Sequence, residues 1–416
     1  MSAIPQSPPA PPRPAGLARD GGELADIHSH LAWLRARHPV ADMTLQDYFG
    51  VPRQVQFKDV HEFTVLGYDA CKEAFVDAAR FSSRGYAPMH DEKLGHPVIL
   101  SMDEPEHRQH RDLVSAGFFT KGLDSWANRS IPAIIHELLD RLPPGGGSAD
   151  FVRDFTYPLP IQVIVGLLGA PREDWPRLLP LVDLQINFGV YPEEGMKAAL
   201  EIRRYIADIV AQRRREPRQD LASTLAAAEI GGERLTDTSI IAFLMVLLSA
   251  GGETTVRALG TLISALLRNP GQFEAVRNDR ALVKPAIEEA LRWDPPVTQL
   301  RRLVTRDTEL GGTALPAGAH ISINVTAANR DPARWPDPDR FDIFREEKSH
   351  LAFGAGPHYC IGVHLAKREI ETAMNAFLDR VDSPRFAGEP AVVQGLALRG
   401  PRRMDLAFNA IRGRSA

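Results

Sequence analysis

A cysteine in a glycine-rich loop is the residue of this sequence best suited to bind a metal. Cys360 lies between Phe353 and Gly362, in the stretch FGAGPHYCIG, and a helical pattern follows. The glycines allow the backbone to turn tightly and to come close to a bulky neighbour. Such a loop can aim several amide N–H groups at one sulfur, and the positive end of the next helix would also stabilise negative charge there. The pattern therefore predicts a metal thiolate at Cys360.

The same loop admits a second kind of metal site. His358, Cys360 and His364 could bind a structural zinc ion, since Cys360 and His364 are one helical turn apart. No fourth ligand lies nearby in the sequence. Zinc is therefore the less favoured interpretation.

A carboxylate and a hydroxyl stand side by side in a long apolar helix. The helix is predicted over residues 240–267, and Gly251 and Gly252 interrupt its apolar run just before Glu253 and Thr254. Each glycine costs about 1 kcal/mol relative to alanine in a helix interior, so we expect a local widening or kink that opens a groove. Glu253 and Thr254 would then offer a proton source and a hydrogen-bond relay beside it. The alternative is a polar patch in which Thr254 bonds to its own helix.

The cysteine loop resembles the haem-binding loop of the cytochrome P-450 haem-thiolate monooxygenases. The matching positions are Phe353, Gly354, Gly356, His358, Cys360 and Gly362. The resemblance implies a mainly α, single-domain cytochrome P-450 fold with a small β component. Heme b would lie between the long central helix and the loop, with Cys360 as its axial ligand. The match is to the soluble bacterial type, and the order of motifs resembles the camphor and monoterpenoid hydroxylases.

The resemblance also assigns roles to individual residues. Thr254 would hold the activated oxygen, and Glu253 would help to resupply protons. The residues assigned to haem binding are His107, Arg111, Arg302, His358, Phe353, Gly356 and Ala250, with Arg301 as the neighbouring alternative to Arg302. The residues assigned to substrate binding are Tyr86, His96, Val246, Ala250, Val297 and Thr298. A network of Glu289, Arg292 and Arg340 would support the loop from behind, in a structural role, because buried charges must be fully paired.

Composition limits the class of protein. The 416 residues carry a net charge of −4, with 25% charged and 44% hydrophobic residues, which argues against a nucleic-acid binder. Cys71 and Cys360 are the only cysteines, so we expect no disulfide framework and a cytoplasmic protein. The proline-rich residues 1–20 are expected to be a disordered tail, and residues 21–416 a single domain. Within it, residues 54–66 are expected to form a short hairpin. We expect no membrane-spanning segment and a monomer.

No nucleotide-binding or flavin-binding fingerprint is present, so electrons are expected from another protein. The resemblance implies a [2Fe-2S] ferredoxin with its reductase. A docking patch is predicted from Arg80, Arg108, Lys367 and Arg368. The resemblance favours O2-dependent hydroxylation of a small, weakly polar molecule, such as a camphor-like or cineole-like monoterpenoid. The competing interpretations are a peroxide-driven peroxygenase of the same fold and a haem protein that only senses or binds its ligand.

Overall fold

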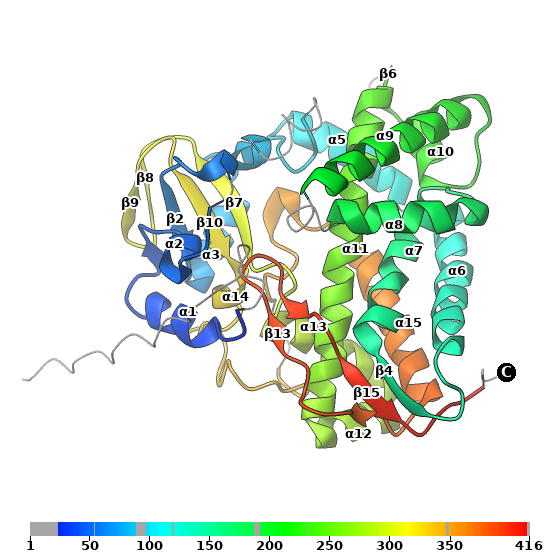
Figure 1. The fold of residues 1–416 in the computed structure, drawn as a ribbon. Coiled ribbons are helices and arrows are strands. Elements are labelled where there is room, and N and C mark those ends of the chain that lie inside the picture. Colours follow the sequence, from blue (N-terminus) through cyan, green and yellow to red (C-terminus); the bar gives the residue numbers. More distant parts are fainter. Residues whose placement is uncertain are drawn as a thin grey trace, which may run out of the picture.

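The computed structural model describes residues 24–53, 55–88, 97–118, 120–186, 192–230, 232–346 and 349–413. A helical body fills one side of the molecule, and a smaller sheet with short helices lies beside it (Figure 1). This arrangement confirms the prediction of a mainly α fold with a small β component.

The central element is α11 (Asp237–Arg268), which runs through the helical body (Figure 1). Its start is fixed by Thr236, whose hydroxyl accepts a hydrogen bond of 3.1 Å from the amide of Ser239. The helix packs against α7 (Pro158–Leu167), α8 (Trp175–Ile186), α9 (Pro192–Arg215), α13 (Val283–Trp293) and α15 (Val363–Arg380).

By length and hydropathy alone, α11 could cross a membrane, which the sequence reading did not anticipate. In this fold 56% of its most apolar window is buried inside the protein. The helix therefore serves as the centre of the largest hydrophobic core.

The main sheet has the strand order β1-β2-β10-β7-β3. Its strands are β1 (Val40–Ala41), β2 (Glu62–Val65), β10 (His320–Asn324), β7 (Gln299–Val304) and β3 (Phe81–Ser82). The expected hairpin over residues 54–66 is wrong, because residues 55–57 form a 3-10 turn and β2 pairs with β1 and, in parallel, with β10. This sheet carries its own core of buried aliphatic and aromatic side chains.

The remaining helices are α1 (His28–Arg35), α2 (Leu45–Phe49), α3 (Tyr68–Val76), α5 (Glu106–Phe118), α6 (Lys121–Asp140), α10 (Leu221–Ala227), α12 (Pro270–Asn278) and α14 (Val325–Ala328). The remaining strands are β4 (Gly147–Asp150), β5 (Glu229–Ile230), β6 (Glu233–Arg234), β8 (Thr308–Leu310), β9 (Thr313–Leu315), β11 (Val381–Asp382), β12 (Arg385–Phe386), β13 (Val393–Gln394), β14 (Gly400–Pro401), β15 (Asp405–Phe408) and β16 (Ala410–Ile411).

A buried ion cluster ties the start of the described chain to its C-terminal part. Arg399 Nε donates to Asp294 Oδ1 at 2.7 Å, and both side chains are 2% exposed. Arg399 Nη1 also donates to the carbonyl of Leu24 at 2.9 Å, and His28 Nε2 lies 3.3 Å from Asp294 Oδ2. Burial is compensated here by opposite charge and by main-chain acceptors. The sequence analysis missed this cluster because its members are far apart in the chain.

Candidate active site

The cysteine loop closes on itself and packs against the end of α3. The amide of Cys360 donates to the carbonyl of Phe353 at 3.0 Å. Gly356 has a φ of +69°, and a Cβ at that position would lie 2.7 Å from the carbonyl oxygen of Phe75. Only glycine fits this close approach without distortion. The helix expected after Cys360 is present as α15, which starts at Val363.

The sulfur of Cys360 faces main-chain donors, as the loop pattern predicted. Burial raises the pKa of the Cys360 thiol, while the amides of Gly362 and Val363 and the guanidinium of Arg111 act in the opposite direction. Each of these three groups favours the thiolate. By contrast, burial raises the pKa of Cys71 beyond the range in which a thiol ionises, and Cys71 packs in the core of the sheet.

Four basic or donor side chains converge beside the loop, and we call His107, Arg111, Arg302 and His358 the basic cluster. The rings of His107 and His358 stack with centroids 3.8 Å apart. Burial, together with the nearby charges of His107, Arg302 and Arg111, lowers the pKa of His358 to about 3. In the described part of the chain, neither Arg111 nor Arg302 forms an ion pair with a carboxylate.

Strand alternation decides between the two neighbouring arginines of β7. Arg301 bonds to Glu62 and lies over the ring of Phe57, with its guanidinium carbon 3.9 Å from the ring centroid. Arg302 is 4% exposed and belongs to the basic cluster. The geometry therefore favours Arg302 over Arg301.

The basic cluster and Cys360 together fit a haem. The Nε2 atom of His107 is buried and has no hydrogen-bond partner among the described residues. A buried polar atom without a partner is costly. Because His107 Nδ1 faces the carboxylate of Glu104 at 3.1 Å, a second carboxylate at Nε2 would bind the doubly protonated ring, and it would also balance the arginines. Haem carries two such carboxylates on one edge and an iron that a thiolate can bind. The basic cluster therefore fits the two carboxylates of haem, and Cys360 fits its iron.

Glu253 and Thr254, which are predicted to act in catalysis, lie on α11 next to a part of that helix that the other described elements do not cover. Ser249 and Ala250 are exposed in the middle of an otherwise largely buried helix, and Thr254 is half-buried. Thr254 Oγ1 donates to the carbonyl of Ala250 at 2.8 Å. This is the bond that the alternative interpretation predicted, and it leaves the threonine oxygen as an acceptor.

The carboxylate of Glu253 has a partner that the sequence analysis missed. Arg257 Nη2 lies 2.7 Å from Glu253 Oε1, and both side chains are 14% exposed. The two residues are one helical turn apart, where side chains on a helix meet. That spacing was visible in the sequence and could have identified the pair.

The interruption expected at Gly251 and Gly252 is not observed. Residues 237–268 form a continuous α-helix. A Cβ at position 251 would lie 3.1 Å from Cδ1 of Ile164. The glycine therefore permits close packing of α7 against α11, and this packing replaces the predicted kink as the reason for its presence.

The predicted substrate contacts have different outcomes. Val246 and Val297 are half-buried. The prediction that Thr298 contacts the substrate is wrong. Thr298 is fully buried, and its hydroxyl donates to the carbonyls of Leu396 and Ala397, so it does not line a site. Tyr86 accepts a 3.1 Å hydrogen bond from the amide of Arg301, and the charge of Arg302 acts on its hydroxyl, so its polar end lies beside the basic cluster. His96 lies outside the described residues.

The supporting ion network contains Arg345 in place of Arg340. Arg292 donates to both oxygens of Glu289 at 2.7 and 2.8 Å, and both residues are buried. Arg345 Nε lies 3.4 Å from Glu289 Oε1. The Arg340 side chain is 68% exposed and faces Asp342 instead. The prediction for Arg340 is therefore wrong, because its loop turns the side chain toward solvent.

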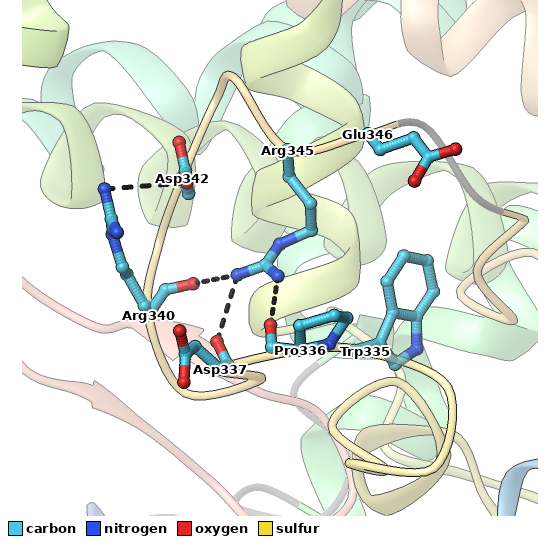
Figure 2. Close-up of a pocket in the computed structure, with 7 residues that line it drawn as sticks. All are labelled: Trp335, Pro336, Asp337, Arg340, Asp342, Arg345 and Glu346. Carbon is cyan, nitrogen blue, oxygen red and sulfur yellow. Dashed lines mark hydrogen bonds and ion pairs between the residues drawn. The ribbon is translucent and has the colours of Figure 1, made fainter.

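Figure 2 shows how Arg345 holds this loop. Its Nη2 atom donates to the carbonyls of Asp337 and Arg340 at 3.0 and 2.9 Å, and Nη1 donates to the carbonyl of Pro336. The loop surrounds a cavity of about 240 Å³. The arginine thus links the buried Glu289 to three main-chain acceptors.

The zinc interpretation finds no support in the geometry. Within the described ranges, no group of three histidine, cysteine, aspartate or glutamate side chains is placed to hold a metal ion together. Cys360 therefore offers a single ligand, which suits a metal that is otherwise bound by a cofactor.

Comparisons with known proteins agree over most of the chain. Residues 161–383 match the family described as Cytochrome P450. Cytochrome P450 107B1 of Saccharopolyspora erythraea is 34% identical over 384 residues, covering 90% of this chain and 92% of the relative. Steroid C26-monooxygenase of Mycobacterium tuberculosis is 35% identical over 386 residues, covering 90% and 91%. The structure of CYP109Q5 from Chondromyces apiculatus superposes with a TM-score of 0.84 at 31% identity, covering 94% and 97%.

Proposed function

The chain belongs to the cytochrome P450 family, and on that premise we propose that it hydroxylates a small hydrophobic molecule, of camphor or cineole size, with O2 and electrons from a ferredoxin. It is a monooxygenase with a haem-thiolate cofactor. The observation that carries the proposal for this chain is the basic cluster beside Cys360, in which Arg111 and Arg302 form no ion pair with a described carboxylate and His107 Nε2 has no described partner.

A thiolate-ligated haem supplies the activation of O2 and the insertion of one oxygen atom into the substrate. In our proposal Cys360 holds the iron, and the amides of Gly362 and Val363 moderate the charge on its sulfur. His107, Arg111, Arg302 and His358 bind the carboxylates of the cofactor. Phe353, Gly356 and Ala250 border it.

Proton supply is assigned to the acid and alcohol of α11. The hydroxyl proton of Thr254 is donated to Ala250, so Thr254 Oγ1 accepts a hydrogen bond from a water or hydroxyl that stands over the helix. Glu253 Oε1 pairs with Arg257 Nη2 at 2.7 Å. A paired carboxylate accepts a proton from solvent and passes it on through water when the pairing loosens.

The proposed substrate is hydrophobic and weakly polar because the half-buried side chains assigned to it, Val246 and Val297, are aliphatic. The relatives carry names that refer to steroid and vitamin D oxidation. Those names and our proposal share the hydrophobic class of substrate. A binding screen that includes both monoterpenoids and steroids measures the size that this site accepts.

Most of the cations assigned to the ferredoxin docking patch are paired with acidic side chains. Arg80 pairs with Glu73 and Asp77 at 2.6 and 2.7 Å, Lys367 pairs with Glu288 at 2.6 Å, and Arg368 pairs with Asp124 at 3.0 Å. These pairs neutralise three of the four proposed cations. Arg108, which is exposed, carries what remains of the patch. We propose a cytoplasmic monomer.

The proposal is tested in two steps on the haem-loaded protein. Carbon monoxide added to the reduced protein should give the strongly red-shifted Soret band of thiolate-ligated haem, and a band at the position typical of histidine-ligated haem would refute Cys360 as the ligand. Turnover is then measured with ferredoxin and reductase, and separately with peroxide. Product with the redox proteins supports the monooxygenase. Product with peroxide alone supports the peroxygenase, and none with either supports the sensor.

A further inference from the structure

A polar pair joins α8 and α11 beside the exposed part of α11. Gln185, near the end of α8, donates from Nε2 to Oγ of Ser249 at 3.2 Å. The two helices pack against each other. The pair is therefore a contact between helices and not a local turn.

This pair leaves one hydrogen-bonding group unused on each side. Gln185 Oε1 is buried and has no hydrogen-bond partner among the described residues. Ser249 accepts from Gln185, and no described acceptor takes its own hydroxyl proton. Buried polar atoms are nearly always paired, and an unpaired one calls for a missing partner. A buried acceptor on a half-buried side chain thus stands next to an exposed donor, and a turn of the Gln185 amide would bring both to a ligand.

The pair borders the candidate active site. Ser249 is exposed and directly precedes Ala250, which accepts the hydrogen bond from Thr254. Val246, Ser249 and Glu253 share one face of the helix, because residues three and four apart lie above one another. A molecule that contacts Val246 and Ala250 therefore has the Gln185 and Ser249 pair within its reach.

We propose that the pair recognises a hydroxyl group on the substrate. A hydroxyl donates to Gln185 Oε1 and accepts from Ser249 Oγ, so it satisfies both unused groups at once. A ketone or ether oxygen only accepts and leaves Gln185 Oε1 unpaired, and a hydrocarbon satisfies neither. This inference rests on the proposed function and sharpens it: the substrate is a hydrophobic alcohol rather than a ketone or an ether.

Three molecules of nearly equal size separate these cases: borneol, an alcohol; camphor, the corresponding ketone; and camphane, the hydrocarbon. Binding to the haem-loaded protein is measured by calorimetry and by the change in iron spin state. We expect borneol to bind about tenfold more tightly than camphane, with camphor in between, as one or two net hydrogen bonds imply. Equal affinities, a preference for camphor, or no binding of borneol would overturn the inference.

Variants assign the preference to the pair. Gln185→Leu keeps the volume and removes the acceptor, and Ser249→Ala removes the donor. In each we expect the advantage of borneol over camphane to fall to about threefold, with the affinity for camphane kept, since one of the two hydrogen bonds is lost. Gln219→Leu, an exposed glutamine outside this site, is the matched control and should keep the full advantage. An unchanged advantage in Gln185→Leu would refute the assignment.

The same samples distinguish this inference from the proposed function. The spectrum with carbon monoxide reports the haem-thiolate, and turnover with redox proteins reports the monooxygenase. Equal binding of the three molecules to an active, thiolate-ligated protein refutes hydroxyl recognition alone. A preference for borneol in calorimetry without the thiolate spectrum upholds hydroxyl recognition and refutes the proposed function.

Discussion

Replacing Arg345 by alanine should destabilise the protein far more than the same change at Arg340. Arg345 faces the buried carboxylate of Glu289 across 3.4 Å and donates to the carbonyls of Pro336, Asp337 and Arg340. Its side chain is only 12% exposed. The Arg340 side chain is 68% exposed, and its nearest acidic partner is 3.6 Å away. The two arginines therefore form a matched pair of substitutions in one loop.

The magnitude follows from the contacts that each variant removes. Three main-chain hydrogen bonds at about 1 kcal/mol each give about 3 kcal/mol. The carboxylate of Glu289 still pairs with Arg292 in this variant, so its buried charge is not left unpaired. Losing the longer contact to Arg345 therefore adds less than the 3–5 kcal/mol expected when a buried pair is fully broken. We therefore expect Arg345→Ala to lose about 3 kcal/mol of the free energy of unfolding. Arg340→Ala should lose less than about 0.5 kcal/mol, as is usual for exposed ion pairs.

Urea unfolding followed by circular dichroism measures both losses, and Soret absorbance per protein measures haem retention. A loss of about 3 kcal/mol is a large part of the typical stability of 5–15 kcal/mol, so Arg345→Ala should also be isolated with less haem. Equal losses in the two variants would refute the assignment of Arg345 to the network. A larger loss in Arg340→Ala would restore the original prediction from sequence.

Three further predictions concern ionisable groups. In Arg257→Met, Glu253 loses its 2.7 Å partner, so product formed per electron consumed should fall several-fold and recover in Arg257→Lys; an unchanged yield would show that the pairing has no part in proton supply. Burial lowers the pKa of His28 to about 4, so only the unfolded chain takes up this proton as the pH falls from 6.5 to 4, and wild type should lose up to about 3 kcal/mol more stability than His28→Gln across that window; parallel pH profiles in urea unfolding would contradict this. His107→Ala should release haem to a scavenging globin about tenfold faster, since it removes the buried ring whose Nε2 would pair with a cofactor carboxylate, whereas His110→Ala on the same helix should not.

Features encoded in short stretches could be predicted from the sequence. The Cys360 loop and the helix that follows it depend on neighbouring residues, and both are present. The choice between Arg301 and Arg302 needed the strand register, because successive residues of a strand point to opposite faces.

Features that depend on the path of a loop or on distant segments could not be predicted. Arg340 and Arg345 lie in the same irregular segment, and no periodicity indicates which side chain turns inward. Gln185 and Ser249 meet only because α8 packs against α11. Asp294 and Arg399 meet only because the C-terminal part of the chain folds back to the end of α13. Contacts of this kind become visible with the tertiary structure.

The placement of Glu253 and Arg257 on one helix makes their pairing independent of the neighbouring helices. Their spacing is set by the backbone of α11, which is continuous from Asp237 to Arg268. If α8 and α9 shift to admit a substrate, neither member of the pair moves with them. Substitutions on α8 or α9 would therefore leave the Glu253 and Arg257 pair unchanged, since both of its members and their spacing belong to α11 alone.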